Sequence, residues 1–187
     1  MRLFSSLFLV FISLLFCADD DKLKIANAIK NASKEHNVDK RLLYTIAKIE
    51  SNFTPNIIAF VSPKKFHIFS KNFDVSVKNI PYDKKYLVQI RAERKCLEII
   101  ARKLIENGFS IDMGIMQINS ANVSQSELPY IFDIDFNIKK SIDILNFCAN
   151  KKNHIKKSIE CYNKGVRKTS NFSYFKKFAK SFKKDFT

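Results

Sequence analysis

The segment from Lys40 to Ser51 constrains the fold more than any other, because as a helix it would be apolar on most of its circumference. Its large apolar side chains leave little polar surface: Leu42, Leu43, Ile46, Ala47 and Ile49. Asp39 stands just before this run, where a side-chain oxygen can cap the first free N–H groups of a helix. A helix that is apolar on nearly all sides is buried. The sequence therefore predicts a central, buried helix over residues 40–51.

Apolar residues spaced three and four apart predict further amphipathic helices along the chain. One early face carries Leu23, Ala26, Ile29 and Ser33. A later helix, which ends at Asn107-Gly108, carries Ala92, Cys96, Ile99, Ile100 and Leu104. Two more carry Ile138, Ile142, Leu145 and Ala149, and then Ile155, Ile159 and Tyr162. These patterns predict a mainly α fold.

The last stretch carries five phenylalanines among lysines: Phe172, Phe175, Phe178, Phe182 and Phe186. We expect a final amphipathic helix that packs on the core at its start and frays at its end. The alternative is that its basic, aromatic face rests on a membrane surface.

The period changes to two between Pro55 and Pro81, most clearly where Phe73, Val75 and Val77 alternate with polar residues. Alternation of this kind is typical of a half-buried strand. We predict a small β-hairpin here, with residues 66–69 as its first strand.

The first residues have the pattern of a signal peptide, with Arg2 before an apolar run from Leu3 to Phe16 and small residues after it. The run is shorter than the ~20 residues that span a bilayer, although a membrane anchor stays an alternative. A lipid on Cys17 is a further alternative, disfavoured because Phe16 precedes it where a small residue is usual. We therefore predict a signal peptide at 1–18, one domain at 19–187 and a periplasmic protein.

The net charge of +15 draws the protein toward polyanions. An exported chain meets the anionic wall and anionic lipids before it meets nucleic acid, and its lysines are spread along the chain. We expect no nucleic-acid binding, a monomer, and peripheral association with the envelope.

Three cysteines follow the predicted signal peptide, Cys96, Cys148 and Cys161, so at least one stays unpaired and the pairing is open. The histidines are isolated from one another and from the cysteines: His36, His67 and His154. This spacing indicates no metal site, and no cofactor is expected.

Glu50 places a carboxyl group on the apolar stripe of the predicted central helix, in line with Leu43, Ile46 and Ala47. Burial raises the pKa of a carboxyl group and keeps it protonated, so that it can donate a proton to a leaving group such as a glycosidic oxygen. The alternatives are an ion pair with Lys48 or Arg41, or a helix end that turns toward solvent.

Two further segments carry polar groups suited to a sugar. In Gly114-Ile115-Met116-Gln117-Ile118-Asn119, the glycine permits a close backbone approach, and the glutamine supplies a donor and an acceptor. Tyr162-Asn163 adds a phenol on an apolar face, where a core tyrosine bonded to backbone is the alternative.

Three segments occur in a specific order: Ile49-Glu50-Ser51-Asn52-Phe53-Thr54-Pro55, Gly114-Ile115-Met116-Gln117 and Cys161-Tyr162-Asn163-Lys164-Gly165. They resemble the soluble-lytic-transglycosylase family, relatives of goose-type lysozyme. The stretch from Ala101 to Asn119 further resembles members that accompany type IV secretion, conjugation or type III secretion. Cys161 and Lys40 depart from the family, which commonly has alanine and proline there.

The resemblance implies a lysozyme-like fold and an enzyme that cuts the glycan strands of peptidoglycan. Glu50 would be the sole catalytic acid and base, with Ser51 fixing the end of its helix. The sugar groove would be lined by Gly114, Met116 and Gln117, followed by Asn119. Tyr162 would orient Glu50, and Asn163 would hold the local turn.

The implied reaction joins the muramoyl C6 hydroxyl to C1 and leaves a 1,6-anhydro end. The rivals are a hydrolytic muramidase, which needs a second carboxylate or a positioned water, and an inactive wall-binding scaffold protein. Asp112 is the nearest acid to a motif, and we expect it to brace the turn before Gly114. Peptidoglycan is the implied partner, with secretion-apparatus proteins as further candidates.

Overall fold

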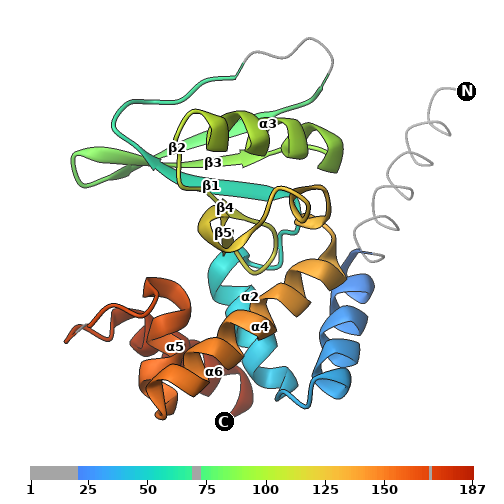
Figure 1. The fold of residues 1–187 in the computed structure, drawn as a ribbon, viewed down its shortest axis with the longest axis vertical. Coiled ribbons are helices and arrows are strands. Elements are labelled where there is room, and N and C mark those ends of the chain that lie inside the picture. The colour runs from blue at the N-terminus through green and yellow to red at the C-terminus, as the bar shows by residue number, and fades with distance from the viewer. Residues whose placement is uncertain (1–20, 69–72, 169) are drawn as a thin grey trace, which may run out of the picture.

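The computed structural model describes residues 21–68, 73–168 and 170–187, in two lobes joined by a central helix (Figure 1). In the sheet lobe, helix α3 (Arg94–Glu106) lies along an antiparallel sheet. The helical lobe contains helical residues 21–35, α4 (Ile134–Lys152), α5 (Ile155–Lys164) and α6 (Ser173–Phe186). The predicted signal peptide lies outside the described residues. Among the described residues, no helix is long and apolar enough to cross a membrane.

Helix α2 (Lys40–Ser51) confirms the predicted central helix and its cap, because the Asp39 carboxylate accepts from the Arg41 N–H at 2.8 Å. Leu43, Ile46 and Ala47 are completely buried. The end of α2 that carries Glu50 lies close to the short strands β4 (Asp112–Met113) and β5 (Ile118–Asn119) (Figure 1). The helix ends where Asn52 and Phe53 both adopt left-handed backbone angles.

The helices form where the spacing predicts them, but several buried faces differ from the prediction. Residues 21–35 bury Ile25, Ala28 and Ile29, whereas Leu23 is 60% exposed. Both sets fit helical spacing, so periodicity alone could not choose between them. Similar shifts expose Ile99 on α3, Ala149 on α4 and Ile155 on α5, while Leu97, Ala101 and Cys148 are buried.

Helix α6 packs against α2 over its whole length, including the end that was expected to fray. The centroids of the Phe186 and Tyr44 rings are 5.4 Å apart, and the Arg41 guanidinium lies over the Phe182 ring. Lys48 binds the Asp185 carboxylate at 2.6 Å. These contacts agree with the prediction that α6 packs on the core: Phe182 and Phe186 lie against α2, and Phe178 is buried.

The β region is larger than the predicted hairpin. The sheet has the order β2-β3-β1-β4-β5, and its long strands are β1 (Ile57–Ser62), β2 (Ser76–Tyr82) and β3 (Lys85–Arg91). The hairpin joins β2 to β3 through Asp83-Lys84, and residues 66–68 of the predicted first strand are not a strand. Pro81 looked like a boundary, but it pairs with Tyr86 in the outermost strand β2, where a missing N–H is tolerated.

A disulfide joins Cys148 of α4 to Cys161 of α5, and Cys96 is a buried free thiol. The bridge resolves the pairing that the sequence left open. It fixes α5 against α4 directly beside Glu160.

Candidate active site

Glu50 occupies the last turn of α2, between the two lobes. Its Oε1 accepts a hydrogen bond from the hydroxyl of Tyr174, which α6 supplies. Lys177 lies one turn further along α6 and donates to the Ile49 carbonyl at 2.8 Å. The alternative, an ion pair of Glu50 with Lys48 or Arg41, is not found, because Lys48 binds Asp185 and Arg41 binds Asp39.

The pKa of Glu50 is raised from 4.5 to about 7, and burial is the main cause. The hydrogen bond from Tyr174 and the charge of Lys177 lower the pKa, while the nearby Asp112 raises it. The carbonyl end of a helix adds a negative potential of the same sign as a carboxylate. Near neutral pH, Glu50 is therefore divided between a form that can donate a proton and a form that can accept one.

The loop from Met113 to Gln117 lies next to the end of α2 that carries Glu50, and side chains of α2, α4 and α5 hold it. Ser51 of α2 donates to the Ile115 carbonyl at 2.7 Å. Asn137 of α4 donates to the Met113 carbonyl at 3.1 Å and accepts from the Met116 N–H at 2.8 Å. Ser51 thus fastens the end of the Glu50 helix to this loop.

The hydroxyl of Tyr162 donates to the Met116 carbonyl at 2.8 Å, so the predicted contact with Glu50 is wrong. Tyr174 makes that contact instead, and the two phenol rings stack with centroids 6.4 Å apart. Burial, followed by the charge of Glu50, raises the pKa of Tyr162, which stays a neutral phenol. Tyr162 supports the loop, and Tyr174 orients the acid.

Gly114 makes room for protein and not for a ligand. A Cβ built at this position would lie 2.3 Å from Nδ2 of Asn137, and the backbone is left-handed with φ of 76°. Met116 is completely buried, so its side chain cannot line a groove as predicted. Both residues shape the loop from within the core.

Gln117, Asn119 and Asp112 are partly exposed at the same loop. Gln117 has a left-handed φ of 49°, which is unusual for this residue type, and its amide donates to the Gly114 carbonyl at 2.8 Å. The Asn119 amide donates to Asp112 at 2.8 Å, bracing β4 against β5. Burial raises the pKa of Asp112, and that hydrogen bond lowers it. Asn163 is exposed near the end of α5.

Glu160 positions Tyr174 and was missed by the sequence reasoning. This carboxylate is 1% exposed and accepts the backbone N–H of Phe175 at 2.8 Å, at the start of α6. The ammonium group of Lys164 lies 2.5 Å from the Glu160 carboxylate and balances its charge. The sequence did carry a signal for Glu160, which is an acid between two apolar residues of α5. It also carried one for Asn137, which is a polar residue on the buried stripe of α4. Tyr174 was hidden among phenylalanines.

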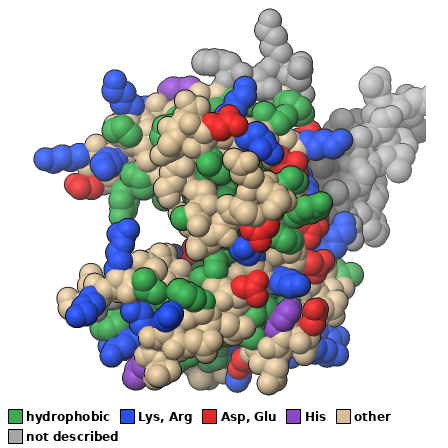
Figure 2. Space-filling view, in the orientation of Figure 1, with side chains coloured by type: hydrophobic (Ala, Val, Ile, Leu, Met, Phe, Trp, Pro, Cys, Tyr) green, Lys and Arg blue, Asp and Glu red, His purple; other side chains and the backbone are tan. Residues whose placement is uncertain are grey.

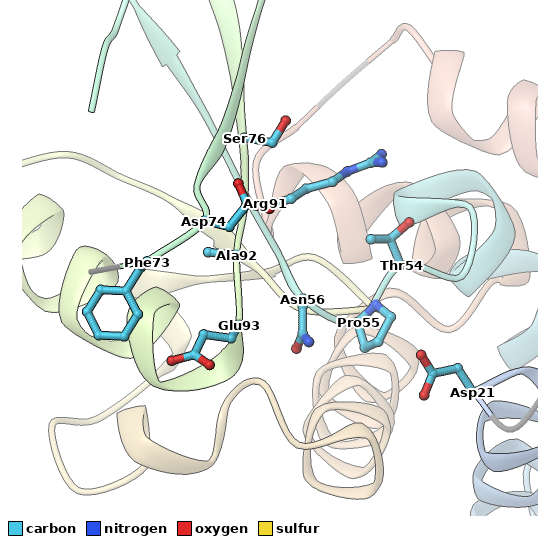
Figure 3. A pocket seen from close by; sticks show the side chains of 10 residues that line it. All are labelled: Asp21, Thr54, Pro55, Asn56, Phe73, Asp74, Ser76, Arg91, Ala92 and Glu93. Atoms are coloured by element: carbon cyan, nitrogen blue, oxygen red, sulfur yellow. The ribbon is translucent and has the colours of Figure 1, made fainter. Parts of the chain in front are cut away.

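The surface is hollowed between the sheet lobe and the helical lobe, as Figure 2 shows. A separate pocket of about 600 Å³ does not include Glu50 (Figure 3). Its charged side chains are of both signs, and Arg91 extends away from Glu93. No tyrosine is among the described residues that line this pocket, so it has no pair of acid and phenol like Glu50 and Tyr174.

No group of three or more His, Cys, Asp or Glu side chains placed to hold a metal ion occurs in residues 21–68, 73–168 and 170–187.

A family model described as the transglycosylase SLT domain matches residues 27–184. The mainly α, lysozyme-like fold predicted from the three motifs agrees with this match. No curated protein and no solved structure matches the chain.

Proposed function

Since the chain belongs to the transglycosylase SLT domain family, we propose that it is a peptidoglycan lytic transglycosylase with Glu50 as its only acid and base. The observation that carries this proposal is the state of Glu50. A carboxyl group with a pKa of about 7, held by a neutral phenol between two lobes, suits both halves of an acid–base cycle.

In the first half of the cycle, protonated Glu50 gives its proton to the oxygen between N-acetylmuramic acid and N-acetylglucosamine. The glycosidic bond breaks, and positive charge develops at C1 of the muramoyl ring. In the second half, ionised Glu50 takes the proton of the muramoyl C6 hydroxyl while that oxygen bonds to C1. The products are a free 4-hydroxyl and a 1,6-anhydro ring, and Glu50 is again protonated.

Hydrolysis by two carboxyl groups is the second candidate, because Asp112 is close enough to raise the pKa of Glu50. Hydrolytic pairs are about 5–5.5 Å apart in retaining enzymes and ~6.5–9.5 Å apart in inverting ones. The hydrogen bond from Asn119 to Asp112 favours a bracing role.

The products of digested sacculi separate the two reactions. Borohydride reduces a free reducing end, which adds two hydrogens to its mass, but leaves an anhydro ring unchanged. We expect fragments whose mass does not change, from the wild type and from Asp112→Asn. Reducible fragments would identify a hydrolase, and loss of all cleavage in Asp112→Asn would favour two carboxylates.

We further propose that the enzyme is exported to the periplasm and opens the wall locally. The charged, apolar and small residues of positions 1–18 support export. The segment from Ala101 to Asn119 resembles family members that accompany secretion systems. This resemblance supports a role of the enzyme alongside a secretion or conjugation apparatus. Amino-terminal sequencing of the periplasmic form should give a start near Ala18 or Asp19.

A further inference from the structure

Basic residues are spread along the chain, but their excess over acidic residues is largest in residues 139–187 of the helical lobe. Residues 139–187 contain 14 of the 33 basic residues but only three of the 18 acidic ones. In Figure 2, Lys and Arg side chains gather with hydrophobic ones at the lower left of this lobe. A pocket of about 460 Å³ lies between α4, α5 and the chain that follows α5.

Five basic side chains line this pocket, which we name the cationic pocket: Lys151, Lys152, Lys157, Arg167 and Lys168. Its acidic residue, Glu160, is already neutralised by Lys164 and by the backbone N–H groups that begin α6. The ammonium group of Lys152 donates a hydrogen bond to the Val166 carbonyl at 2.8 Å. The pocket therefore presents a net positive charge that no carboxylate lining it offsets, and charge-assisted bonds to an anion are its natural use.

Three exposed apolar residues are neighbours of basic residues of the cationic pocket, on α4, at the start of α5 and just after α5. Phe147 is 50% exposed, Ile155 65% and Val166 51%. The ammonium of Lys151 lies 5.9 Å from the centre of the Phe147 ring. Ile155 begins α5, three residues after the last residue of α4, and Val166 is tied to Lys152. Phe147 and Val166 thus lie beside Lys151 and Lys152 of the pocket, and Ile155 stands between Lys152 and Lys157 in the sequence. We call the pocket and these three residues the α4–α5 corner.

We propose that this corner docks on an anionic membrane surface, with a lipid phosphate in the cationic pocket and the three apolar side chains in the interfacial layer. Basic residues near an anionic leaflet and apolar residues that enter its boundary add their contributions to peripheral binding. The carboxylates of a wall peptide match the charge but give no role to Phe147 and Ile155. Glu160 lines the pocket and positions Tyr174, so the substitutions that test the docking leave Glu160 and its partner Lys164 unchanged.

Vesicle sedimentation tests the proposal with the chain from residue 19, so that the apolar leader does not contribute. All described elements lie within this part. We expect binding to vesicles of phosphatidylcholine with phosphatidylglycerol, weak binding to phosphatidylcholine alone, and weakening by salt. Replacing Lys151, Lys157 and Arg167 by Gln should reduce binding roughly 100-fold, since each basic residue contributes about a factor of five.

The matched control replaces Lys78, Lys84 and Lys85 by Gln, which removes the same charge from exposed positions on the β2–β3 hairpin. This variant should bind vesicles nearly as the parent does. A third variant, Phe147→Ser with Ile155→Ser, should weaken vesicle binding roughly tenfold but leave binding of soluble glycerol phosphate unchanged. Circular dichroism checks that each variant is folded.

Three outcomes overturn the proposal. The first is equal binding to charged and neutral vesicles, and the second is an equal loss in the two triple variants, which would mean that only net charge matters. The third is displacement from vesicles by soluble muropeptides that bind the parent but not the pocket variant, which would assign the pocket to wall peptides.

Discussion

The hydroxyl of Tyr174 donates a hydrogen bond to the Glu50 carboxylate across 124 residues of sequence. This contact joins α6 to the end of α2. Glu160 holds the start of α6 in place, because its carboxylate accepts hydrogen bonds from the first N–H groups of that helix. Glu160 in turn is adjacent to the disulfide between Cys148 and Cys161. The acid is therefore oriented by a chain of contacts that runs through the helical lobe.

Glu50→Gln should abolish cleavage of sacculi while preserving the fold. The amide keeps the shape of the carboxyl group but cannot give up and regain a proton, and such acid–base function contributes about 10²–10⁴-fold to a rate. Release of soluble fragments measures turnover, and cosedimentation with sacculi measures binding. Lysis at the parental rate would remove Glu50 from the mechanism.

The same substitution should change stability in a pH-dependent way. The pKa of Glu50 is about 7 in the folded protein and near 4.5 in the unfolded chain, so ionisation favours unfolding as pH rises from 4.5 to 7. Glu50→Gln should therefore raise the free energy of unfolding at pH 8, by up to about 3 kcal/mol, and change it less at pH 4. Urea denaturation at both pH values measures the difference, and an equal effect at both would contradict the raised pKa.

Tyr174→Phe and Tyr162→Phe should have different effects on the pH profile of kcat/KM. The parent should lose activity as pH rises through about 7, when Glu50 ionises. Tyr174→Phe removes the hydrogen bond that lowers this pKa, so the alkaline limb should move to higher pH, with a rate loss of about tenfold to a hundredfold.

Tyr162→Phe should leave the alkaline limb in place and act on stability. It leaves the Met116 carbonyl without its phenol donor, at a cost of about 1–3 kcal/mol in the free energy of unfolding. A shift of the limb in Tyr162→Phe alone would return the orienting role to Tyr162.

Gly114→Ala should destabilise the protein more than Gly108→Ala. Both glycines have a left-handed backbone, with φ of 76° and 79°, so both substitutions cost about 1–2 kcal/mol from this conformation. Only Gly114 faces Asn137 at a distance that a Cβ cannot occupy, which adds about 1–3 kcal/mol of overpacking. Thermal unfolding compares the two variants, and equal losses would mean that Asn137 can move away.

Several features of the protein were decided by local sequence. The N-cap at Asp39 joins residues only two positions apart, and the apolar spacing of α2 buries Leu43 and Ile46 whatever packs against them. The position of Glu50 on that buried helix, and hence its raised pKa, follows from the same spacing. Interactions between near neighbours in sequence depend on helix geometry alone, which makes them predictable.

The rest was decided by tertiary packing. Tyr174, and not Tyr162, reaches Glu50 because α6 packs along α2, and neither helix carries a local signal for that pairing. Gly114 is a glycine because Asn137 of α4 fills the space beside it. The sheet extends across β3 and β1 because strand pairing joins segments far apart in sequence. Contacts of this kind depend on the shapes of surfaces that exist only once the helices and strands have packed, so no local pattern encodes them.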